Sequence, residues 1–349
     1  MGSSGIRGVF TYNRLSMSAH TVFALSTIAT VVPTIFYVGI IYWFDRYEKE
    51  PWWLLTAAFL WGAIPSIIIA FSFNTLFSIP LYLVAGDGAG EALAASLIAP
   101  PVEETIKGAA LLAIFFWWRD EIDSPLDGII YGAMVGVGFA MVENVFYFVN
   151  VYNEGGPEAW GLNIFMRGII FGLNHALFSS MTGLGIAIAR MATSTLTRFL
   201  APLLGWTIAM FLHFLHNASV SFGNLLCLVA LVTDWGGVWL TVAIIVWALL
   251  QERRWIREYL VEEVRAGTLT LSQYETACSG RKRIRHNIRL LFSRGPRAYG
   301  DAARFFQRCS KLAYRKHHFK LFGDGASRQH TEQLRIEISD LSHRLLFGD

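Results

Sequence analysis

Long apolar runs dominate this chain and restrict the folds it can adopt. About 20 helical residues cross the hydrocarbon core of a bilayer, and seven stretches are apolar over at least about that length, with less certain edges in the last two: 20–44, 53–83, 92–118, 127–149, 161–189, 200–223 and 235–250. Only 16% of the 349 residues are charged, too few for the surface of a soluble protein of this size. We therefore expect an all-α fold: a polytopic membrane helix bundle of about seven transmembrane helices, with a cytoplasmic helical tail.

The charges in the connections between these runs orient the bundle. Three connections carry Lys or Arg, near 45–51, 119–126 and 190–198. The three that alternate with them carry acidic residues and no basic ones, near 84–91, 150–160 and 224–234. Basic loops stay on the cytoplasmic side of a membrane. The alternation predicts an N-terminus outside the membrane and a C-terminus in the cytoplasm.

The C-terminal part of the chain differs from the rest in charge. Residues 251–349 hold 20 of the 29 Lys and Arg residues and 11 of the 26 Asp and Glu residues, so this tail carries +9 and residues 1–250 carry −6. We interpret 1–250 as the transmembrane domain and 251–349 as a basic, mostly helical tail that regulates activity or binds the cytoplasmic face. Its RKRIRHNIR segment (281–289) favours anionic headgroups of the lipid bilayer. Nucleic acid is the rival partner, and we expect none because the chain is membrane-anchored.

Ionisable and amide side chains lie inside four of the predicted spans. An ionisable group near the bilayer centre costs at least about 2.5 kcal/mol, so its default interpretation is functional and inward-facing. The candidates are Glu103, Glu104 and Lys107 in the third span, Glu143 and Tyr147 in the fourth, His175 in the fifth, and His213 and Asn217 in the sixth. Residues four apart share a helix face, so each helix offers a narrow polar face, and one internal cluster is the simplest arrangement.

Prolines and glycines flank these candidates. Pro100-Pro101 removes two backbone donors just before the acidic pair, which predicts a kinked helix with free carbonyl groups. Gly128, Gly132 and Gly136 form a small-residue face, which predicts close packing against another helix rather than chemistry.

The candidate side chains suit hydrolysis by activated water. A carboxylate accepts a proton from water, while a histidine or amide stabilises the oxyanion of a tetrahedral intermediate. Lys107 would help to keep one of the two adjacent acids ionised, and the sequence leaves open whether Glu103 or Glu104 is the base. Serine-based proteolysis is weaker, because no GxSxG segment occurs, although Ser179 lies four residues after His175. We expect no cofactor and no metal.

Two other classes of function compete with this one. A metalloprotease would use Glu and His ligands, and the lack of an HExxH segment argues against it only weakly, because ligands can come from separate helices. A proton-coupled transporter or a membrane scaffold also tolerates buried acids. Transporters often contain a repeat of broken helices, however, and the Pro-Pro-Glu-Glu segment has no second copy.

The same residues carry a family resemblance. EETIK (103–107), FAMVENVFY (139–147), NHALFSSMTGLG around His175 and HFLHN (213–217) resemble the membrane motifs of the PrsW family of glutamic intramembrane proteases, which are related to the CAAX-prenyl endopeptidases. DRYEKEPWWLL (45–55) resembles the opening of the family. The resemblance covers about 45–225 and leaves the tail out.

The resemblance implies a function and a set of site residues. In the related CAAX enzymes, Glu-Glu, FxxxH and HxxxN motifs form the site; Glu103 and Glu104 match the first, and His213 with Asn217 match the last. Glu143 stands where those enzymes have histidine, which leaves it open as an acid, a metal ligand or a structural partner, while His175 is a candidate for the missing imidazole. The implied activity is site-1-type cleavage of membrane-anchored proteins, such as anti-sigma factors, in a bacterial plasma membrane. Substrate identity and oligomeric state are not implied.

Overall fold

The computed structural model describes residues 17–223, 225–323 and 325–347, and within these ranges the chain is helical, with short connections and no strand. Residues 1–16, which the sequence predicts to lie outside the membrane, are not among them. Five helical runs are long and apolar enough to cross a membrane, judged by length and composition: α1 (Ala19–Phe44), Trp52–Trp117, Pro125–Met191, α7 (Thr195–Ser221) and α8 (Leu226–Arg265). The predicted all-α membrane bundle is confirmed.

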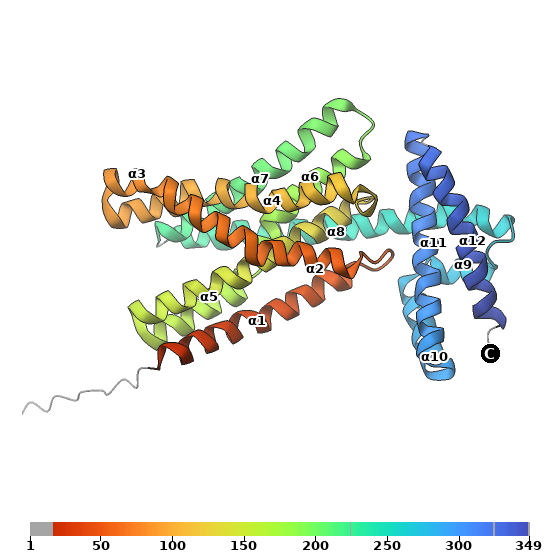
Figure 1. The fold of residues 1–349 in the computed structure, drawn as a ribbon, viewed down its shortest axis with the longest axis horizontal. Helices are drawn as coiled ribbons and strands as arrows, with labels where there is room; N and C mark the ends of the chain where they lie inside the picture. Colours follow the sequence, from red (N-terminus) through yellow and green to blue (C-terminus); the bar gives the residue numbers. More distant parts are fainter. Residues whose placement is uncertain (1–16, 224, 324, 348–349) are drawn as a thin grey trace, which may run out of the picture.

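Two of the five runs are hairpins that pass through the bundle twice (Figure 1). The first contains α2 (Trp52–Trp61), the π-helical turn η1 (Gly62–Ser66), α3 (Ile67–Leu93), the π-helical turn η2 (Ala94–Ile98) and α4 (Ala99–Trp117). The second contains α5 (Pro125–Phe165), the π-helical turn η4 (Met166–Ile170) and α6 (Asn174–Met191). The short 3-10 turn η3 (Arg119–Glu121) lies between the two hairpins.

A glycine reverses the chain in each hairpin. Gly86 in α3 and Gly156 in α5 both have φ of 75°, a backbone conformation that glycine adopts without the steric cost of a Cβ atom. The arms then return antiparallel, since Arg167 bonds back to Glu143 across the second hairpin. Counting each arm separately, the chain makes seven passes, in agreement with the number expected from the apolar runs.

The glycine face of α5 forms a close helix contact with α6. A Cβ atom on Gly128, Gly132 or Gly136 would lie 2.2, 2.4 or 2.0 Å from a backbone carbonyl oxygen of α6. No residue with a side chain fits at that separation, so the prediction of close helix packing is confirmed. The contact fixes α6, and with it the first helical turn that carries His175, against α5.

The irregular segment before α4 has a specific partner. The Ala99 N–H bonds to the carbonyl of Ala94 in η2, and Pro100 has no N–H to offer. The Ala95 carbonyl is thereby left without a helical donor, and the amide of Asn217 donates to it at 2.8 Å. A π-helical turn and a carbonyl free of helical donors lie where Pro100-Pro101 predicts an irregular helix, and a side chain from α7 satisfies this carbonyl.

The seventh pass begins earlier and ends later than the sequence indicates. The predicted span was 235–250, with Asp234 in an outer connection, but α8 starts at Leu226 and buries Asp234 at 2% exposure. It also continues without a break through residue 250 to Arg265, so the tail begins inside a helix. The error arose because glycines and one acid near 234–237 look like a loop.

The tail forms a second helical unit across one end of the bundle. It consists of the end of α8, α9 (Leu271–Ala277), α10 (Gly280–Arg294), α11 (Pro296–Phe322) and α12 (Gly325–Phe347), around a core that includes Trp255, Ile256, Phe305 and Ile338. Figure 1 shows the tail helices lying across the end of the bundle, with α8 reaching them and packing against α11.

Polar contacts attach the tail to the connections at this end of the bundle. Arg283 of α10 donates to the carbonyl of Tyr47 at 2.9 Å, and Arg315 of α11 donates to the Asp120 carboxylate at 3.1 Å. Lys311 lies 3.6 and 3.5 Å from the carboxylates of two further acids, Glu48 and Glu121. The basic tail therefore packs against acidic residues of the membrane domain, which agrees with the opposite charges of the two parts.

Candidate active site

A cavity of about 970 Å³ opens inside the bundle, among α3, α4, α5, η4, α6 and α7. Its walls include six of the eight candidates predicted from the sequence: Glu103, Glu143, Tyr147, His175, His213 and Asn217. It extends to Tyr82 and Asn150, near the reversals at Gly86 and Gly156, and so toward the end opposite the tail. The structure brings the predicted residues together around one space.

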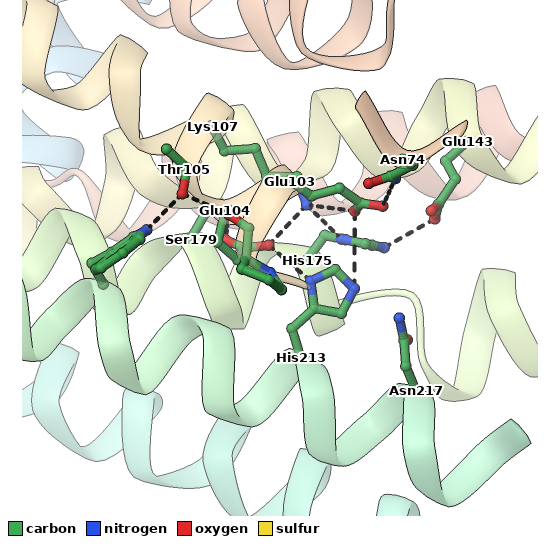
Figure 2. A network of polar contacts seen from close by, with 12 residues as sticks. Asn74, Glu103, Glu104, Thr105, Lys107, Glu143, His175, Ser179, His213 and Asn217 are labelled. Carbon is green, nitrogen blue, oxygen red and sulfur yellow. Dashed lines mark hydrogen bonds and ion pairs between the residues drawn. The ribbon is translucent and has the colours of Figure 1, made fainter. Parts of the chain in front are cut away.

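The two adjacent glutamates have different surroundings (Figure 2). Glu103 lines the cavity, where its Oε1 accepts from Asn74 of α3 at 3.2 Å and its Oε2 lies 3.4 Å from Lys107. Glu104 is fully buried and is not part of the cavity wall. Its Oε1 accepts from Lys107 at 2.8 Å, and its Oε2 accepts from Ser179 at 3.1 Å. Of the two adjacent glutamates, Glu103 faces the cavity and Glu104 does not.

Lys107 joins the two acids to the rest of the site. Its ammonium group is fully buried and contacts both glutamates, and it lies 3.0 Å from Nδ1 of His175. The ammonium also lies 3.7 Å from the centre of the Phe139 ring, a favourable cation–π distance. A buried cation with this set of partners is a fixed positive charge at the centre of the cluster.

The contacts of His175 define its tautomer. An ammonium group can only donate, so Nδ1 of His175 accepts from Lys107. The other nitrogen, Nε2, lies 3.0 Å from Oε2 of Glu143 and donates to that carboxylate. Both ring nitrogens are therefore engaged, and the histidine bridges Lys107 to Glu143.

Arg167 of η4 contacts three residues on this side of the site. Its guanidinium donates to Glu143 at 2.6 Å and to Asn144 at 2.8 Å, and it stacks 3.7 Å from the centre of the Tyr147 ring. Glu143 thus accepts from two donors, which hold its carboxylate in the cavity wall. Tyr147 contributes a ring face to this arrangement.

His213 has the opposite tautomer to His175. Its Nδ1 lies 3.1 Å from Oε1 of Glu104, and because a carboxylate can only accept, Nδ1 carries the hydrogen. The free lone pair of Nε2 then faces Oε2 of Glu103 at 3.9 Å. That separation is too long for a direct hydrogen bond between the two side chains.

Three residues contribute to the site without having been selected from the sequence. Asp234 of α8 lies 2.7 Å from Nδ1 of His216 and accepts from Asn174 at 3.0 Å. Asn174 directly precedes His175 in α6, and His216 lies one helical turn after His213 in α7. Asn74 holds Glu103, and Arg167 holds Glu143. The available signal was weak for each: one acid at a blurred helix start, one amide in an apolar run, and one arginine near an interface.

One group of side chains has the composition of a metal site. Donor atoms of Glu103, His175 and His213 lie within 4.8 Å of one another, and two histidines with one glutamate are a known ligand set of catalytic zinc. His213 fits this role, since a carboxylate on the other ring nitrogen is a usual support for a metal-binding histidine. His175 does not fit as arranged, because Lys107 occupies its only lone pair. A divalent ion would also meet the buried ammonium group.

Comparisons with known proteins agree with this geometry. The model of the family described as PrsW family intramembrane metalloprotease matches residues 50–250. Protease PrsW of Geobacillus kaustophilus is 29% identical over 198 residues, which are 54% of this chain and 75% of that protein. Protease PrsW of Clostridioides difficile is 31% identical over 140 residues (40% and 55%), and that of Bacillus subtilis is 27% identical over 164 residues (47% and 68%). No solved structure matches the chain.

The matched segment contains the cavity and each of the site residues described above, and it excludes the tail. It covers more than half of the chain. The protein therefore belongs to the PrsW family, a family of intramembrane proteases.

Proposed function

We propose that this protein hydrolyses peptide bonds of membrane-anchored protein substrates with a water molecule activated by Glu103. The observation that carries the proposal is the 3.9 Å gap between Oε2 of Glu103 and Nε2 of His213, two acceptors that face each other at the cavity wall. A water molecule in this gap would donate one hydrogen to each acceptor, which points its lone pairs away from them and toward a substrate carbonyl.

The reaction uses Glu103 as acid and base in turn. The water oxygen attacks the carbonyl carbon while one water proton passes to Glu103, and the carbonyl π electrons move to the oxygen to give the oxyanion. Glu103 gives its proton to the nitrogen as the tetrahedral intermediate collapses, so the C–N bond breaks with a neutral amine as the leaving group. The products are a carboxylic acid and a free amine.

Lys107 and Glu104 support this step from behind the cavity wall. Lys107 contacts both glutamates, so it favours the ionised form of Glu103 as a base. Oε1 of Glu104 accepts from Nδ1 of His213 and from the ammonium group of Lys107, so it orients both side chains. The proposed role of Glu104 is therefore to position two other groups, while Glu103 meets the water.

Asn217 and His213 are the proposed oxyanion donors. One N–H of the Asn217 amide donates to the Ala95 carbonyl, and the second N–H has no partner among the described residues. His213 would donate through Nε2 only when that nitrogen is protonated.

The proposed substrate class follows from the cavity and the family. The cavity lies within the bundle and extends toward the end opposite the tail, so a substrate span would be cut in that half or just beyond it. The curated relatives are proteases of the same family, and anti-sigma-factor-like proteins with one span are the proposed substrates. A plasma-membrane location with a cytoplasmic tail is part of this proposal.

A metal-dependent protease is the second candidate. It is favoured by the Glu103, His175 and His213 group and by the description of the family as metalloproteases. It would require Lys107 to leave His175, since both cannot use the same lone pair. Stoichiometric zinc in active protein, with activity lost on chelation and restored by zinc, would establish this candidate and refute the metal-free one.

The decisive experiment uses full-length protein in liposomes with a labelled single-span protein as substrate. Glu103→Gln should abolish cleavage, because it keeps shape and hydrogen bonding but removes the base. Glu91→Gln is the matched control, since Glu91 also lines the cavity and lies outside the polar cluster. Cleavage by wild-type protein should persist after chelation. Retained activity in Glu103→Gln would sink the glutamate mechanism.

A further inference from the structure

Helix α10 carries a basic and apolar face that the bundle and the tail core do not use. Its inner side is fixed, because Arg283 is buried and donates to Ala277, Tyr47 and Ser310. Residues on the other side of the helix are exposed. This helix lies outside the matched segment, and none of its residues lines the cavity.

The exposed face combines two kinds of side chain. Ile284, Ile288 and Phe292 follow one another at intervals of four residues and are 56%, 47% and 85% exposed. Arg281, Arg285 and Arg289 follow the same interval beside them, and all three are exposed without an ion pair to an acid of the described chain. By contrast, Lys282, on the flank of the helix, pairs with Glu275. The face is thus a row of large apolar groups next to a row of free positive charges.

The position of α10 brings this face to the edge of the membrane. Arg283 contacts the carbonyl of Tyr47, only three residues after α1 ends at Phe44. The exposed aromatic residues Tyr42 and Trp43 end that helix, as is usual at a membrane interface. Figure 1 shows α10 crossing the end of the bundle and extending past α1, so part of it lies beyond the bundle's own footprint.

We propose that the exposed face of α10 binds the anionic phospholipid surface beside the bundle, with Ile284, Ile288 and Phe292 at the boundary of the acyl chains and Arg281, Arg285 and Arg289 among the phosphate groups. Helices with separate apolar and basic rows lie in this way in membrane interfaces. A nucleic acid would use the arginines but would leave the three large apolar groups in water. The lipid surface accounts for both rows with one partner.

The test compares full-length protein in nanodiscs of neutral phosphatidylcholine with nanodiscs that also contain phosphatidylglycerol. Hydrogen–deuterium exchange should be slower across residues 284–292 in the anionic discs, and added salt should reverse the effect. One basic residue near an anionic surface contributes about fivefold to binding. Arg285→Gln with Arg289→Gln should therefore weaken binding about 30-fold and remove the protection.

Arg265→Gln with Arg344→Gln is the matched control. It also removes two exposed charges, at the far ends of α8 and α12, and should leave the protection intact. Equal exchange in the two discs, or protection that survives in the α10 variant, would overturn the proposal. So would protection in neutral discs by inorganic phosphate or by a DNA duplex, because either would identify a soluble anion as the partner.

Discussion

Nδ1 of His216 lies 2.7 Å from Oδ2 of Asp234, across the contact between α7 and α8. The same carboxylate oxygen accepts from Asn174, which directly precedes His175. Asp234 is 2% exposed, so it is a buried acid with two donors and no direct part in the cavity chemistry. Its contacts link the ends of α6 and α7 that carry the site histidines.

Asp234→Asn should slow turnover and lower stability. The variant turns the carboxylate into a neutral amide, so the oxygen shared by His216 and Asn174 loses its charge and both hydrogen bonds weaken, at a cost of about 1–3 kcal/mol. We expect a lower kcat with little change in KM, measured on a membrane-anchored substrate, and a lower melting temperature. Asp87→Asn is the control, because Asp87 is exposed beside the reversal at Gly86. A wild-type kcat in Asp234→Asn would exclude a positioning role.

Lys107→Met should destabilise the protein by about 3–5 kcal/mol, since it leaves two buried carboxylates without their cation. Thermal unfolding in detergent measures the loss. The double variant Lys107→Met with Glu104→Gln should recover much of the stability, because one of the two buried charges is removed with the cation. It should remain inactive. If the double variant were no more stable than the single one, the ion pairs would not be the source of the effect.

Gly132→Ala should reduce activity by separating α5 from α6. The added Cβ would lie 2.4 Å from the carbonyl oxygen of Ser179, and backbone must move to make room. Ser179 and His175 would then shift relative to Glu104 and Glu143. Gly161→Ala, also in α5, has no atom within 4 Å of the new methyl group and serves as control. Comparing cleavage rates and melting temperatures of the two variants tests whether this contact sets the site geometry.

Asp45 should make stability depend on pH. Its carboxyl follows α1 and is 1% exposed, and this burial raises its pKa to about 6, against the lowering effects of Lys49 and of the Glu50 N–H. The folded state therefore holds a proton that the unfolded state releases, so stability is lost as the pH rises from about 4 through 6, by at most about 3 kcal/mol. Asp45→Asn cannot titrate. The melting temperature of the variant should rise relative to that of wild type as the pH increases from about 4 to about 6. Parallel curves over that range would contradict this origin.

The fold could be predicted from apolar length because membrane helices satisfy their own backbone groups, and the α5–α6 contact could be predicted because only glycines permit it. The start of α8 could not be predicted, because an acid beside two glycines is typical of a loop. Asp234 is buried in a helix here because His216 and Asn174 bond to its carboxylate. Likewise, adjacent glutamates are equivalent in sequence. Only the packing of α4 against α6 and α7 encloses Glu104 and leaves Glu103 on the cavity wall.

Helix α8 runs unbroken from Asp234, beside the catalytic chamber, to Glu263, which Lys316 and Arg335 clamp in the tail. These two residues are about 44 Å apart along a helix that contains no proline. The helix is thus a stiff rod that joins the bundle to the tail. A tilt of about 3° at the tail displaces the Asp234 end by about 2 Å unless the rod bends. We therefore expect a displacement of the tail to reach Asp234 and, through it, the helix ends that carry His175 and His213.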